Sequence, residues 1–193
     1  MNFIAKLSRH ISDDLVRSNV VKAEDAEIYI YGINQILISV LNVFSALIIG
    51  LIFGVLFEIL VFMAVYIPLR SYAGGYHART PLRCYIFSVI MLIAVSLGLE
   101  YLCIAEWVYY VVFALAIIII CILSPVEDKN KPLDEIERKV YKKRTIAITM
   151  IDTLIVLLFD IIGIDNPCVA VVYSFVVLSL MLVVGKAKTV ANC

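Results

Sequence analysis

The chain has 193 residues, of which 63% are apolar or aromatic, whereas soluble domains lie nearer half. Mean hydropathy is +1.02, and only 17% of the residues are charged, with 16 basic side chains balancing 16 acidic ones. This composition excludes a water-soluble globular domain, and no basic excess points to nucleic acid as a partner. It predicts an integral membrane protein.

Long uncharged stretches separate the clusters of charge, as at 28–57, 107–126 and 166–185. Each can cross a hydrocarbon core as a helix, which takes about 20 residues. Backbone groups must be paired in lipid, so only helices or a closed barrel can span it. The apolar runs are continuous, whereas barrel strands alternate. We therefore expect an all-α integral membrane protein.

The sequence predicts six transmembrane helices. They cover Ile33–Phe53, Val55–Leu69, Cys84–Leu99, Trp107–Leu123, Ile146–Ile162 and Val169–Gly185. All lysines and arginines then fall on one side of the alternating path, which marks that side as cytoplasmic. Both termini are expected in the cytoplasm.

The first residues predict a helix of a different kind. Phe3, Ile4, Leu7, Ile11 and Leu15 recur at helical spacing among charged residues, as in amphipathic helices that lie at a membrane interface. No apolar segment of a secretory signal peptide is present. We expect one membrane domain over 1–193. It comprises an interfacial segment over 1–27, a six-helix bundle over 33–185 and a cytoplasmic tail over 186–193.

A candidate catalytic pair lies in the basic connection after the second span. His77 precedes Cys84 by seven residues, and a thiolate with an imidazole that accepts its proton is the minimum for thiol catalysis. On one continuous helix these residues would be about 10.5 Å apart along the axis, too far to meet. However, Thr80 and Pro81 are typical of a helix start, with Thr as N-cap and Pro at the first position.

Cys84 is therefore expected in the opening turn of the third span, with His77 in a loop that Gly74 and Gly75 allow to fold back. The helix N-terminus and the charges of Arg79 and Arg83 favour a thiolate there. The alternative is ordinary: a cysteine near the end of an apolar helix is usually a small buried hydrophobe. Catalytic zinc needs about three protein ligands, more than this loop offers, so we expect no metal and no cofactor.

This loop resembles the signature of the AgrB family (accessory gene regulator protein B), bacterial membrane endopeptidases of peptide quorum sensing. The resemblance rests on Arg70, Gly74–Ala78 and Cys84, on Glu27–Gly32 at the entry to span one, and on Ser124–Leu133 after span four. It implies a bacterial cell membrane location, with the active site at the cytoplasmic face.

The resemblance also implies a substrate and a reaction. An AgrD-like precursor peptide would lose its C-terminal tail to attack by Cys84, with His77 as base and then acid. The signal segment would remain as a thioester until a thiolactone or lactone ring closes. The resemblance also points to a homodimer as the assembly.

Other polar residues are open to more than one interpretation. Arg70 braces the catalytic loop, binds a carboxylate, or anchors at the interface with its head in water. Lys129 and Lys131, in the loop like that of the family, either hold the precursor's acidic tail or anchor the next span. Lys142 to Arg144, at the end of a helix expected over 132–144, have the same two interpretations. Asp152, inside span five, either has a function, such as orienting His77, or faces a watery crevice.

A competing function is that of a small polytopic peptide transporter or export partner. Six spans and an acid inside the membrane would suit it, but it does not require the pair of His77 and Cys84. We therefore expect a cysteine peptidase, with Gly75 and Arg79 supporting the catalytic pair.

Overall fold

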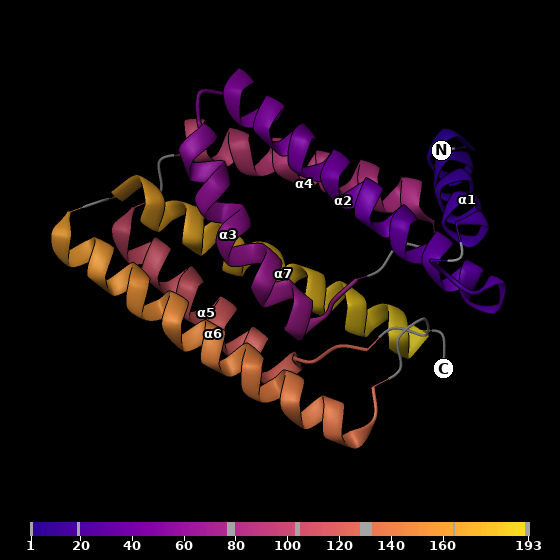
Figure 1. Cartoon of the computed structure of the whole chain (residues 1–193). Coiled ribbons are helices and arrows are strands. Elements are labelled where there is room, and N and C mark those ends of the chain that lie inside the picture. Colours follow the sequence, from indigo (N-terminus) through magenta and orange to yellow (C-terminus); the bar gives the residue numbers. More distant parts are fainter. Residues whose placement is uncertain are drawn as a thin grey trace. The chain divides into compact units, whose positions relative to one another are not determined.

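A computed structural model describes residues 2–18, 20–76, 80–102, 105–127, 133–163 and 165–191. Within these residues, regular structure is helical apart from one isolated bridge. The helices, shown in Figure 1, are α1 (Asn2–Arg17), η1 (Ala23–Asp25), α2 (Ala26–Ile52), α3 (Leu56–Ala73), α4 (Pro81–Tyr101), α5 (Glu106–Leu123), α6 (Glu135–Ile162) and α7 (Asp165–Ala191).

Each predicted span corresponds to one helix. Among the described residues, five helices are long and apolar enough to cross a membrane: α2, α3, α4, α6 and α7. The apolar part of α5, Trp107–Leu123, is shorter. The all-helical, multi-pass class is thereby supported, whereas six crossings and the orientation of the termini stay predictions.

Two boundaries differ from expectation. The helix expected over 132–144 and the span expected over 146–162 form the single helix α6, since nothing between them breaks the backbone hydrogen bonding. Likewise, α7 continues to Ala191 through the start of the expected tail at Lys186. Charged residues here extend membrane helices beyond their apolar parts.

The chain divides into two compact units. The first comprises Met1–Ile48 and Ala78–Leu92. In it, α1 forms as the amphipathic pattern predicts, and the Ser12 hydroxyl donates to the Ala26 carbonyl at 3.2 Å. A hydrogen bond of 2.8 Å joins the hydroxyls of Ser45 on α2 and Tyr85 on α4.

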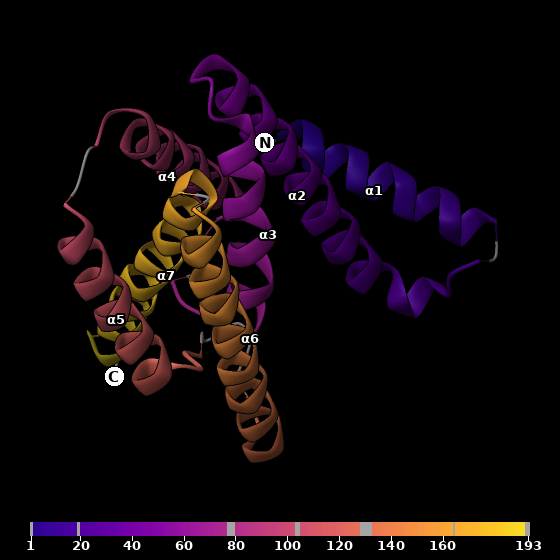
Figure 2. The ribbon, with the colours of Figure 1, turned by 90° about the vertical axis from the view of Figure 1, so that its left-hand side faces the viewer.

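The second unit comprises Ile49–His77 and Ile93–Cys193. Its core is α7, which packs against both α3 and α5, while α6 packs against α3. Figure 2 shows α7 between α5 and α3. Phe175 of α7 is fully buried and meets the ring of Phe113 with centroids 4.9 Å apart. The Ser174 hydroxyl donates to the Phe62 carbonyl at 3.1 Å, which ties α7 to α3.

Candidate active site

Cys84 lies in the opening turn of α4, as predicted. The helix begins at Pro81, and the Thr80 hydroxyl accepts from the Arg83 N–H at 3.4 Å. The Cys84 N–H donates to the Thr80 carbonyl at 3.1 Å. Cys84 is half-buried and its thiol is free. The first helical turn therefore presents a free thiol at the end of a predicted span.

Two predicted site residues of the same loop, His77 and Arg79, lie outside the described residues. The pairing of His77 with Cys84 thus stays a prediction. The structure does describe the three residues that lead up to His77, Gly74 to Tyr76, and these belong to the second unit.

The backbone at Gly74 requires glycine. Its φ is +76°, and a Cβ there would lie 2.2 Å from the Val126 carbonyl oxygen. Gly74 forms an isolated parallel bridge with Val126, whose N–H donates to the Ala73 carbonyl at 2.9 Å. Gly75 follows with a φ of +128°. The end of α3 is thereby fixed against the segment that follows α5.

Contacts with α3 and α7 hold Tyr76 in place. Its N–H donates to the Met181 carbonyl of α7 at 3.1 Å. Its carbonyl accepts from the Arg70 guanidinium at 3.1 Å, and the Lys188 ammonium lies over its ring, 4.9 Å from the centroid. The residue before His77 is therefore tightly positioned within the second unit.

Arg70 makes a second hydrogen bond with the other arm of its guanidinium. It donates to the Tyr66 hydroxyl at 2.6 Å, and its central carbon lies 5.6 Å from the centroid of the Tyr66 ring. Arg70 thus connects α3 to the loop leading to His77. Its effect on catalysis stays a prediction.

Gly185 of α7 lies close to the segment before His77, a contact that the sequence argument missed. A Cβ on Gly185 would lie 2.8 Å from the Gly75 carbonyl carbon and 2.9 Å from the Tyr76 nitrogen. Both are backbone atoms, so neither can move aside easily. Small residues such as glycine allow close backbone approach in membrane helices, but the approaching segment lies far away in sequence.

Asp152 is buried on one face of α6 together with Thr145, Thr149 and Val156. One of its carboxylate oxygens has no hydrogen-bond partner among the described residues, and the same holds for the Thr149 hydroxyl. Asp152 thus lies within a helix that is long and apolar enough to cross a membrane. Because His77 lies outside the described residues, an interaction between Asp152 and His77 stays a prediction.

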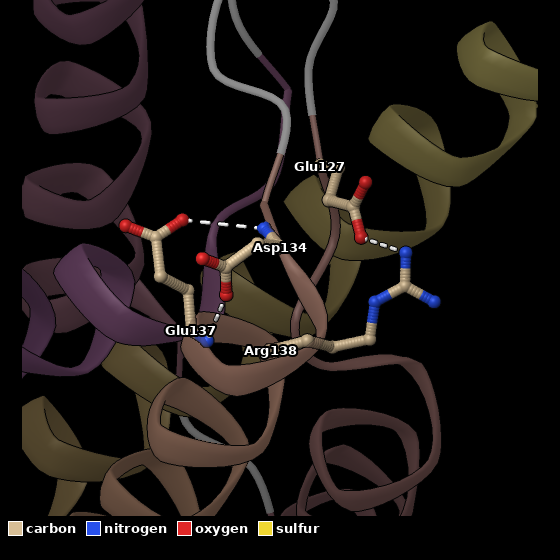
Figure 3. Close-up of polar contacts among 4 residues, drawn as sticks. All are labelled: Glu127, Asp134, Glu137 and Arg138. Atoms are coloured by element: carbon tan, nitrogen blue, oxygen red, sulfur yellow. Dashed lines mark hydrogen bonds and ion pairs between the residues drawn. The ribbon is translucent and has the colours of Figure 1, made fainter.

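Lys129 and Lys131 lie outside the described residues. The chain before and after them is held by polar contacts, drawn in Figure 3. Arg138 forms an ion pair with Glu127. The Asp134 carboxylate accepts from the Glu137 N–H at 2.6 Å, while the Glu137 carboxylate accepts from the Asp134 N–H at 3.3 Å. This capping box starts α6.

Two of the basic residues considered for binding an acidic tail have partners inside the protein. The Lys142 ammonium donates to the carbonyls of Cys121 and Ser124. Arg144 donates to the Tyr72 hydroxyl at 3.2 Å and lies over its ring.

In the described part of the chain, no three His, Cys, Asp or Glu side chains gather as metal ligands would.

Comparison with known proteins decides the family. The family model of accessory gene regulator B matches residues 6–185. The chain belongs to the AgrB family. An AgrB-like protein of Listeria monocytogenes (serotype 4a, strain HCC23) is 30% identical over 163 residues, which cover 81% of this chain and 79% of the relative.

An AgrB-like protein of Clostridium perfringens (strain 13) is 27% identical over 158 residues, covering 78% of this chain and 72% of the relative. No solved structure matches the chain. Membership of the AgrB family implies an accessory gene regulator function in quorum sensing, an AgrD-like precursor as partner and a membrane setting. The long apolar helices fit that setting.

Proposed function

We propose that this AgrB-family chain is a membrane cysteine endopeptidase that removes the C-terminal tail of an AgrD-like precursor. The observation that carries the proposal is the free, half-buried Cys84 thiol in the first turn of α4. The N-terminus of a helix presents partial positive charge at this end of α4. Arg83, one residue earlier, adds a full charge.

The reaction begins with transfer of the Cys84 proton to His77. The sulfur attacks the carbonyl carbon of the bond before the tail, and a tetrahedral intermediate forms. His77 then gives the proton to the leaving nitrogen, and the C–N bond breaks. The tail departs as a free amine, and the rest of the precursor remains on Cys84 as a thioester.

Ring closure follows by acyl exchange. A cysteine or serine of the bound signal segment loses its proton to His77 and attacks the thioester carbonyl. The C–S bond to Cys84 breaks, the Cys84 sulfur recovers the proton, and a thiolactone or lactone ring is complete. Water must be kept from the thioester throughout, which a site at the membrane edge favours.

The segment before His77 supports this assignment. A general base must be held within hydrogen-bond reach of the proton it takes. Gly74 to Tyr76 are fixed by hydrogen bonds from Arg70 and to Met181, so the backbone entering His77 is well positioned. In the proposal, Gly75 and Arg79 support His77.

Other residues have binding roles in the proposal. Lys129 and Lys131 hold the acidic tail of the precursor, and Asp152 acts on His77 or on a basic side chain. The site faces the cytoplasm, where the precursor is made, and a homodimer is the working assembly. None of these roles is needed for the first test.

The test is mass spectrometry of the precursor after coexpression with the wild type, Cys84→Ala or His77→Ala. The wild type should remove the tail and form a thioester adduct on Cys84, and both variants should leave the precursor intact. Cys121→Ala is the matched control, since Cys121 is another half-buried free cysteine in a predicted span. Normal tail removal by Cys84→Ala would refute the proposal.

A second candidate function, peptide transport or export, is favoured by one observation. Asp152 is buried in a helix long enough to cross the membrane and leaves one oxygen without a described partner. Such acids often mark transport pathways. If Cys84→Ala still exports a ring peptide supplied to the cell while Asp152→Asn does not, transport is the better account.

A further inference from the structure

A pocket of about 570 Å³ lies where α5 ends and the charged start of α6 becomes apolar. Its lining comes from α6 and from the connection that follows α5. The lining residues are Ser124, Pro125, Arg138, Lys139, Lys142, Lys143 and Ile146. Four of these side chains are basic, so the pocket has a strongly positive rim. All belong to the second unit.

The four cations are not equivalent. Arg138 is neutralised by Glu127, and Lys142 binds the carbonyls at the end of α5. Lys139 and Lys143 are exposed, and neither ammonium has a hydrogen-bond or ion-pair partner within the residues that the structure describes. They lie four residues apart, one turn along the same face of α6. The pocket therefore offers two adjacent cations to an anion.

The face of α6 that carries these lysines continues as an apolar surface. Ile146, Met150 and Leu157 follow at spacings typical of one helix face, and all three are exposed. On α5, exposed apolar residues follow the same spacing back from the pocket, at Val111, Leu115, Ile118 and Ile122. Below the positive rim, both helices thus present apolar surface along the length of a predicted span.

We propose that this pocket binds one anionic glycerophospholipid, with the phosphate between Lys139 and Lys143 and an acyl chain along the exposed face of α6. Two features support a lipid. The positive rim complements an anionic headgroup, and basic pockets between membrane helices on one face are typical headgroup sites. The apolar surface continuous with the rim complements an acyl chain, which neither inorganic phosphate nor a soluble peptide would occupy.

The acidic tail of a peptide is the competing occupant. A tail that binds by charge alone would use the lysines but leave the face from Ile146 to Leu157 unused. The proposal does not depend on the peptidase activity, because no pocket residue belongs to the catalytic pair. A competition experiment between the lipid and an acidic peptide distinguishes the two occupants.

The test is native mass spectrometry of the purified full-length protein, titrated with phosphatidylglycerol or phosphatidylcholine. The wild type should prefer phosphatidylglycerol. Lys139→Gln with Lys143→Gln should weaken its binding about thirtyfold, because each interfacial lysine contributes a factor of about five. The control, Lys6→Gln with Lys186→Gln, removes two exposed lysines outside the pocket and should weaken phosphatidylglycerol binding much less than the pocket pair does.

The double variant Lys139→Arg with Lys143→Arg changes both side chains but keeps their positive charge, so it controls for misfolding. It should retain the preference for phosphatidylglycerol. Inorganic phosphate should not displace the lipid. The proposal is overturned if the Gln pair binds phosphatidylglycerol as the wild type does, if the control pair loses it equally, or if an acidic peptide displaces it from the wild type.

Discussion

Arg70 joins two parts of the chain through the two arms of one guanidinium, at the Tyr66 hydroxyl and the Tyr76 carbonyl. Lysine has a single ammonium and cannot reproduce this fork. We expect Arg70→Lys to lower the rate of tail removal about ten- to a hundredfold, because small displacements of a catalytic group have effects of that size. The rate is followed by mass spectrometry of the precursor under single-turnover conditions.

Tyr66→Phe provides the graded comparison, because it removes one acceptor of Arg70 and leaves the bond to Tyr76 in place. Its effect should be smaller than that of Arg70→Lys. If Arg70→Lys processes the precursor at the wild-type rate, Arg70 is an interfacial anchor and does not position the loop.

Gly185→Ala tests the close approach of α7 to the segment before His77. A methyl group there would lie 2.8 Å from a Gly75 backbone atom, so the loop must shift. We expect tail removal to fall at least tenfold, although alanine favours helix more than glycine does. Rates of precursor cleavage, normalised to the amount of protein in the membrane, provide the measurement.

The matched control for Gly185→Ala is Gly32→Ala in α2, where a Cβ meets no atom within 4 Å. It should leave cleavage unchanged. Equal losses in both variants would mean that alanine in a membrane helix is harmful for reasons unrelated to the loop.

Local signals explain which parts of the site could be predicted. The position of Cys84 follows from Thr80 and Pro81, which are its neighbours in sequence, and the structure confirms it. The contact of Gly185 with Gly75 joins residues more than 100 positions apart. No periodicity or turn signal encodes such a contact, because it arises from tertiary packing of α7 against the end of α3.

At the scale of elements, α6 begins with a capping box at Asp134 and Glu137. Asp134→Ala should remove about 1 kcal/mol from the stability of the first turn, which corresponds to about fivefold faster amide hydrogen exchange there. Asp134→Asn should exchange as the wild type does, because asparagine caps helices as well as aspartate. Equal exchange in Asp134→Ala and the wild type would show that tertiary packing, and not the cap, holds this turn.

The same helix shows why boundaries were harder to predict than elements. The charged residues before Ile146 suggested a separate helix outside the membrane, and the apolar residues after it suggested a span. The polarity of the side chains indicates whether a helical turn lies in water or in lipid. The continuity of the helix depends instead on its backbone hydrogen bonds. With no proline or glycine between Glu135 and Ile162, the backbone continues as one helix.

For the whole molecule, the open question is whether α5 crosses the membrane. Its 18 residues extend about 27 Å at the rise of an α-helix, slightly less than the hydrocarbon thickness of about 30 Å. Mismatch of this size costs only a fraction of a kcal/mol per Å. If α5 did not cross, the basic residues from Lys129 to Arg144 would lie outside, against the positive-inside rule. We therefore expect six crossings.

The number of crossings determines where the C-terminus lies, so one pair of fusions tests it. With a cytoplasmic N-terminus and six crossings, a fluorescent reporter fused after Cys193 should lie in the cytoplasm and fluoresce. Alkaline phosphatase fused after Tyr101, at the end of α4, should be outside and active. Five crossings, without α5, would leave the Tyr101 fusion active but place the C-terminal reporter outside, where it stays dark. The C-terminal reporter thus separates the two topologies, and the Tyr101 fusion verifies that α2, α3 and α4 cross as expected.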